Sequence, residues 1–170
     1  PAAMHRQNPR IFSWITVEIL AEAGDTAPLT VALSALPAVM DVQDVGAPLA
    51  PGESVTVSVM ADATFNRISV VAMLVPTNDA FVAVNAVDIS GGSVTVRALA
   101  YDAGTEFNDE LCAHIPGPAS VCTGEGFNMS RDNAEGFVHV HRGIHGIGDL
   151  NASVYDWRNP VARVSISAMP

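Results

Sequence analysis

Hydrophobic residues follow a helical spacing near the start of the chain and an alternating spacing further along. Residues 15–23 (ITVEILAEA) predict a short helix. A second helix is expected between Thr26, which can cap it, and Pro37, which ends it. Its inward face would carry Leu29, Leu33 and Leu36. The sequence therefore predicts one or two short helices before the remaining elements.

Beyond these helices the pattern favours strands. They are predicted at residues 54–60, 68–75, 80–87, 94–100, 137–141 and 161–166. The continuous apolar run at 68–75 (ISVVAMLV) is expected to be buried on both faces. Short strands without helices between them indicate an all-β fold, an antiparallel β-sandwich. Residues 106–135 predict no regular element, and so long a loop is usually functional or braced.

The composition agrees with one folded domain over residues 1–170. Hydrophobic residues make up 49% of the chain and charged residues 15%, and no apolar run is long enough to cross a membrane. The net charge of -10 disfavours nucleic acid as a partner, and it disfavours anionic membranes unless calcium bridges the two surfaces. Solubility and affinity for cations both explain this charge.

Acidic residues gather after two of the predicted strands. Asp79 follows the strand at 68–75, and Asp102 and Glu106 follow the strand at 94–100. If these strand ends lie on the same side of the fold, the carboxylates converge, and a cation would cancel their repulsion. Oxygen ligands on loops suit calcium. The alternative is an ordinary solvated loop.

A second cluster is rich in histidine. His139 and His141 alternate along a predicted strand and should share a face, and His145 follows a glycine. With His5 they could bind a transition metal such as copper or zinc, because imidazole nitrogen suits these ions. The alternative is that these histidines are structural, anchoring loop carbonyls.

Cys112 and Cys122 flank a loop containing Pro-Gly-Pro. In an exported protein they would form a disulfide, and in a cytosolic protein they would stay reduced; we favour the disulfide. No arrangement of a nucleophile with a base is visible, so an enzyme is not predicted. A metalloenzyme with an open metal position stays an alternative.

Several motifs together resemble bacterial spondin-domain proteins, relatives of the amino-terminal domain of F-spondin. These motifs are PTNDAF, AYDAGTEFNDE, IPGP, VHVHRGIHGIGDL and YDWRNPVARV. The resemblance implies a β-sandwich similar to calcium-dependent lipid-binding modules, in a secreted, periplasmic or cell-surface bacterial protein. It also implies calcium at Asp79, Asp102 and Glu106. The family's first strand has no counterpart here, which would leave a sheet edge unpaired.

The expected function is therefore calcium binding with a role in adhesion to an extracellular or surface ligand. A narrower similarity to the surface copper proteins of methane-oxidising bacteria gives the alternative. In that case the protein would bind copper, or zinc, through His139, His141, His145 and His5.

Overall fold

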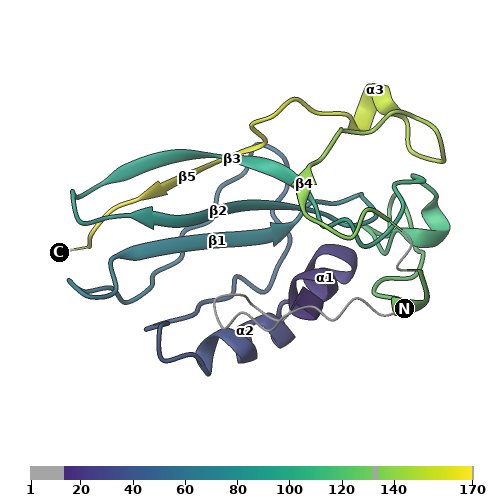
Figure 1. Cartoon of the computed structure of the whole chain (residues 1–170). Helices are drawn as coiled ribbons and strands as arrows, with labels where there is room; N and C mark the ends of the chain where they lie inside the picture. The colour runs from purple at the N-terminus through teal and green to yellow at the C-terminus, as the bar shows by residue number, and fades with distance from the viewer. Residues whose placement is uncertain (1–13, 132–133, 170) are drawn as a thin grey trace.

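Five antiparallel strands form one sheet in the computed structural model, which describes residues 14–131 and 134–169 (Figure 1). The strands are β1 (Arg67–Met73), β2 (Ala80–Asp88), β3 (Val94–Asp102), β4 (His139–Val140) and β5 (Ala162–Ile166). Their order is β1-β2-β3-β4, and β5 pairs with the beginning of β3 while β4 pairs with its end. The antiparallel, mostly β fold is thus confirmed. The described residues contain no second sheet facing this one, and the sandwich stays a prediction.

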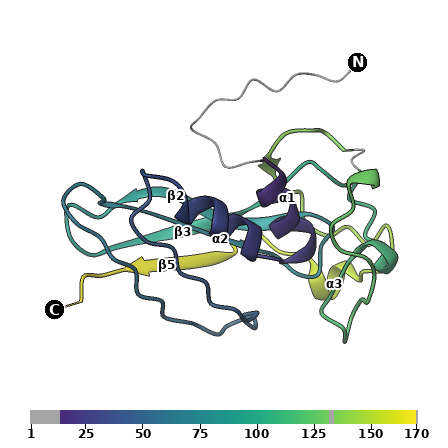
Figure 2. The ribbon, with the colours of Figure 1, turned by 90° about the horizontal axis from the view of Figure 1, so that it is seen from below.

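Two helices cover part of one face of the sheet (Figure 2). Helix α1 (Trp14–Ala23) and helix α2 (Ala27–Ser34) confirm the two predicted near the N-terminus. Leu20 of α1 and Leu29 of α2 pack with Phe81 of β2 in the main hydrophobic cluster. A further short helix, α3 (Ala152–Tyr155), was not predicted; Asn151 caps it by accepting the Ser153 N–H at 2.9 Å.

Two details of the second helix differ from the prediction. The Thr26 hydroxyl donates to Asp44 and does not cap α2, whereas Asp25 Oδ1 accepts the Ala27 N–H at 3.0 Å. Leu36 lies beyond the end of α2 and is 40% exposed. The helix therefore buries a shorter apolar face than the leucine spacing indicates.

Three strand predictions were wrong in extent or burial. Residues 54–60 form no strand, and the valines of this segment are exposed, because an alternating pattern makes a strand only where a neighbouring strand supplies hydrogen bonds. Strand β1 is partly exposed along its length and not buried on both faces. Val71 of β1 packs against the cluster that contains Leu20 and Leu29 of the two helices. The predicted strand at 137–141 is shortened to β4.

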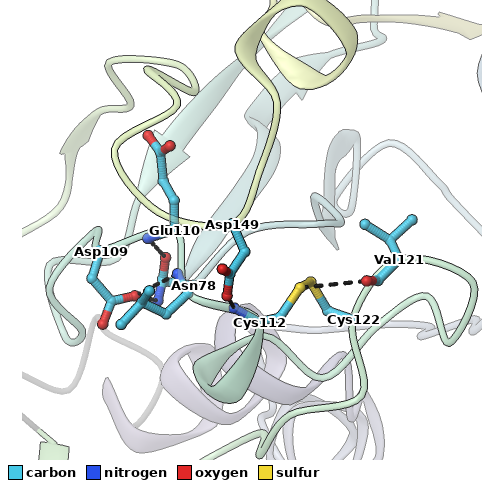
Figure 3. Close-up of a disulfide and its surroundings, with 8 residues drawn as sticks. Asn78, Asp109, Glu110, Cys112, Val121, Cys122 and Asp149 are labelled. Atoms are coloured by element: carbon cyan, nitrogen blue, oxygen red, sulfur yellow. Dashed lines mark hydrogen bonds between the residues drawn. A yellow bond between two sulfur atoms is a disulfide. The ribbon is translucent and has the colours of Figure 1, made fainter.

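The loops after β3 pack at one end of the sheet around a second apolar cluster. Ile115, Cys122, Ile144 and Leu150 form its centre. Regular structure between β3 and β4 is limited, within the described part, to two 3₁₀ turns, η1 (Cys112–His114) and η2 (Met129–Arg131). The predicted disulfide between Cys112 and Cys122 is confirmed (Figure 3).

Polar side chains, both exposed and buried, tie these loops to one another. Asp149 accepts the Cys112 N–H at 2.9 Å, and Asn78 Oδ1 accepts the Glu110 N–H at 3.2 Å (Figure 3). Glu110 in turn accepts the N–H groups of His145 and Ile147. The loop end of the sheet is therefore braced by a disulfide and by side-chain hydrogen bonds to the loop backbone.

Two sequence expectations lie outside these residues. His5, and the unpaired edge expected next to the first residues of the chain, fall within 1–13. None of the described helices has the length and apolar composition required to span a membrane.

Candidate metal site

Asp79 and Asp102 approach each other because β2 begins at the end of the sheet where β3 finishes. Among the described residues, the group whose ligand atoms all lie within 4.8 Å of one another contains Asp102 but neither Asp79 nor Glu106. Ala80 is the register partner of Asp102, and the Asp79 carbonyl accepts the Ala103 N–H at 3.1 Å. Asp79 and Asp102 are both fully buried. The strand register therefore brings these two strand ends together, as the sequence predicts.

One oxygen of Asp79 is saturated and the other has no partner. Oδ2 accepts the Thr105 N–H at 2.8 Å, the Thr105 hydroxyl at 3.1 Å and the Glu106 N–H at 3.1 Å. Oδ1 is buried and has no hydrogen-bond partner among the described residues. Burial, together with the charge of Asp102, raises the pKa of Asp79 to about 6. This carboxylate is therefore held in place on one side and unsatisfied on the other.

Like Asp79, Glu106 has one carboxylate oxygen that is paired and one that has no partner among the described residues. Its side chain is 1% exposed and pairs through Oε1 with Arg131, which also contacts Glu125 at 2.6 Å. Oε2 is buried and has no hydrogen-bond partner within the described residues. Burial and the charge of Glu22 raise the pKa of Glu106 to about 8, although Arg131 opposes this shift.

Two residues of this cluster, Glu22 and Arg131, were not predicted from the sequence. Glu22 lies on α1, is 1% exposed and accepts the Asn128 N–H at 3.2 Å. Helix α1 is otherwise apolar but carries two glutamates four residues apart, Glu18 and Glu22. Acidic side chains are rarely buried without a partner, so this pair was the feature of the sequence that could have indicated a buried acidic cluster. Arg131 comes from the irregular 106–135 segment, where spacing carries no such information.

Asp102 faces the histidines as well as Asp79. Its Oδ1 accepts the Gly104 N–H at 2.7 Å, and its Oδ2 accepts the Asn108 side-chain N–H at 2.5 Å. The Nε2 atoms of His139 and His141 lie 3.6 Å and 3.9 Å from Oδ2, so the two rings do share a side of the sheet. Asp102 therefore joins the acidic cluster to the histidine cluster.

Both ring nitrogens of His141 are already used. Nδ1 accepts the Gly143 N–H at 3.0 Å, so Nε2 carries the proton and donates to Asn108 Oδ1 at 2.9 Å. Burial lowers the pKa of His141, which keeps the ring neutral. The geometry gives His141 the role of orienting Asn108, which in turn holds Asp102.

The remaining predicted histidine, His145, is exposed, and its backbone N–H donates to Glu110 Oε1 at 2.7 Å. It lies outside the group of side chains that could hold a metal ion, which comprises Asp102, Glu135 and His139. One ligand atom from each of these residues lies within 4.8 Å of the others. Glu135 was not predicted, because it lies in the irregular segment before β4.

Comparison with known proteins assigns no family. No family model, curated protein or solved structure matches the chain. The similarity to spondin-domain proteins therefore stays a prediction, and the function is inferred from the geometry of the chain's own residues.

Proposed function

We propose that the protein is a calcium-binding β-sheet module that presents its braced loops to an extracellular or surface ligand. The ion would be held by Asp79, Asp102 and Glu106. The observation that carries this proposal is a pair of buried carboxylate oxygens, Asp79 Oδ1 and Glu106 Oε2, that have no hydrogen-bond partner among the described residues. Such atoms are costly to bury and are typical ligands of a hard cation.

The charge balance of the cluster supports the same conclusion. Charge repulsion acts between Asp79 and Asp102 and between Glu106 and Glu22, and Arg131 pairs with Glu106. Asp79 and Asp102 have no arginine within salt-bridge distance in the described part of the chain. A divalent ion would offset the burial and the charge of Asp102 that together raise the pKa of Asp79.

Calcium would also connect segments that are distant in sequence. Asp79 lies before β2, Asp102 ends β3, and Glu106 begins the long loop segment that leads to the disulfide. Binding would therefore stabilise the loop end of the sheet and order a surface for contacts. We expect this surface to bind a partner and not to catalyse a reaction, and a disulfide-braced, acidic module suits an exported or surface location.

Thermal unfolding with and without calcium tests the proposal. Chelation should lower the melting temperature of the parent protein, and Asp102→Asn should reproduce most of that loss. The matched control is Asp88→Asn, because Asp88 ends β2 at the opposite end of the sheet and pairs with the exposed Arg67. The control should keep the full calcium response. The proposal would be excluded if calcium did not change the melting temperature of the parent protein.

A further inference from the structure

A second cluster of ligating atoms lies on the other side of Asp102. Asp102 and His139 are register partners in the β3–β4 pair, and Glu135 comes from the segment that leads into β4. One ligand atom of each lies within 4.8 Å of the other two. Two ligands bound to one ion at roughly 2.1 Å are about 3.4 Å apart in a tetrahedral site, close to the 3.6 Å between His139 Nε2 and Asp102 Oδ2.

The tautomer of His139 suits metal ligation. Nδ1 lies 3.3 Å from the Phe137 carbonyl oxygen, which can only accept, so Nδ1 carries the proton. The lone pair of the neutral ring is then on Nε2, the atom nearest Asp102. The 3.6 Å separation is too long for a hydrogen bond. A backbone carbonyl that accepts from one ring nitrogen is the usual partner of a histidine whose other nitrogen binds a metal.

Asp102 is oriented by its own supporting groups. Gly143, His141 and Asn108 form a chain of hydrogen bonds that ends at Asp102 Oδ2, and the Gly104 N–H fixes Oδ1. A fully buried carboxylate held in this way loses little freedom when it binds an ion. His141, one of the histidines predicted as metal ligands, thus positions Asp102 through Asn108.

A glycine allows the third ligand to approach. Gly104 has a φ of +72°, and a Cβ atom at this position would lie 2.9 Å from the Phe137 nitrogen. The Gly136 N–H donates to the Gly104 carbonyl at 2.8 Å and fixes the contact. Glu135, the residue before Gly136, is brought to the end of β3 by this close packing.

We infer that Asp102, Glu135 and His139 form a binding site for a divalent first-row transition ion of the zinc type, next to the proposed calcium site and sharing Asp102 with it. One imidazole nitrogen and two carboxylate oxygens match the ligands of such ions, whereas calcium avoids imidazole. The two carboxylates balance the charge of a divalent ion. Glu135 is exposed and His139 is half-buried, so an ion can enter and solvent water completes the coordination.

This site differs from the four-histidine set that the sequence predicts and shares only His139 with it. It is also independent of calcium binding except through Asp102, which belongs to both. Failure of the calcium proposal would leave the inference standing, because Asp79 and Glu106 are not zinc ligands here.

Calorimetric titration of the metal-free parent protein with zinc chloride, in the presence of excess calcium, tests the inference. We expect one equivalent of zinc to bind without being displaced by calcium. His139→Gln should weaken zinc binding by roughly 100-fold or more, and Glu135→Gln by at least about 10-fold. Circular dichroism shows whether His139→Gln is folded. If it is not, Glu135→Gln still tests the site, because Glu135 is exposed.

Two controls separate this site from other histidines and from calcium. His145→Gln, at an exposed histidine outside the group, should bind zinc as the parent protein does. Asp79→Asn should keep zinc binding while it loses calcium binding. Absence of zinc binding in the parent protein, unchanged affinity in both His139→Gln and Glu135→Gln, or displacement of zinc by calcium would each overturn the inference.

Discussion

Asp79 and Asp102 lie side by side where β2 begins and β3 ends, and both are fully buried. The charge of Asp102 adds to the effect of burial and raises the pKa of Asp79 to about 6. Hydrogen bonds satisfy one oxygen of Asp79 only. The pairing of two antiparallel strands therefore concentrates negative charge at one end of the sheet, and the stability of the protein should depend on how this charge is neutralised.

The pH dependence of stability follows from Glu106. Its pKa of about 8 in the folded protein lies above the ordinary 4.5, so the folded state binds more protons between these values. The free energy of unfolding of the metal-free protein should then fall as pH rises from 7 to 9. Urea denaturation in a chelator at several pH values measures this slope.

Measurements of stability above pH 7 report on Glu106 and not on His141. Burial lowers the pKa of that ring, so its contribution to stability is present above pH 6.5 and is lost as pH falls. Glu106→Gln should remove the slope between pH 7 and 9, and saturating calcium should reduce it in the parent protein. Equal slopes in parent and variant would contradict the pKa assigned to Glu106.

Removing Arg131 should make the protein more dependent on calcium. Arg131→Met removes the partner of the buried Glu106, whose pKa of about 8 lets it stay protonated near neutral pH, so the loss of unfolding free energy in the absence of metal should be roughly 1–3 kcal/mol. Calcium should restore most of this loss. The control, Arg158→Met, removes an exposed arginine paired with Asp156 and should change stability by about 0.5 kcal/mol or less. Equal losses in the two variants, measured by urea denaturation, would contradict the role of Arg131.

The close approach at Gly104 predicts a difference between two glycines with the same backbone preference. Gly52 has a φ of +83° and open space around it, so Gly52→Ala should cost roughly 1–2 kcal/mol. Gly104→Ala adds a clash with the backbone of Phe137 and should cost more than this. It should also weaken zinc binding, because the segment that carries Glu135 must move. Calorimetry and thermal melting of the two variants compare both effects, and similar behaviour would show that this contact is not needed.

Loss of the disulfide should destabilise the loop end. Replacing both Cys112 and Cys122 by alanine frees a short loop, and chain-entropy arithmetic for about 11 residues gives a loss of about 2.8 kcal/mol. Cys122 also packs with Ile115, Ile144 and Leu150, so a larger loss is expected if this cluster loosens. Denaturation of the double variant beside the oxidised parent measures the difference. A loss near zero would show that the hydrogen bonds of Glu110 hold the loops without the disulfide.

The sequence predicted best the features that depend on neighbouring residues. Both N-terminal helices, most strands and the Cys112–Cys122 pairing follow from local spacing, and they are present. Residues 54–60 failed because alternation describes the two faces of a strand but does not supply a pairing partner. The convergence of Asp79 with Asp102 was predictable because antiparallel pairing places the start of one strand beside the end of the next.

The parts of the site that sequence reasoning missed depend on long-range packing. Glu22 reaches the cluster because α1 packs on the sheet, and Glu135 reaches Asp102 because Gly104 admits a neighbouring backbone. The different roles of His139 and His141 also emerge only from their hydrogen bonds, since alternate residues on one strand look equivalent in sequence.

The most direct test of the central claim is a calcium titration of the chelator-treated protein by calorimetry, beside Asp79→Asn. The substitution removes a buried carboxylate charge and keeps the side-chain shape. We expect the parent protein to bind one equivalent of calcium and Asp79→Asn, shown to be folded by circular dichroism, to bind none. A parent protein that binds no calcium, or a variant that binds it equally well, would contradict the account.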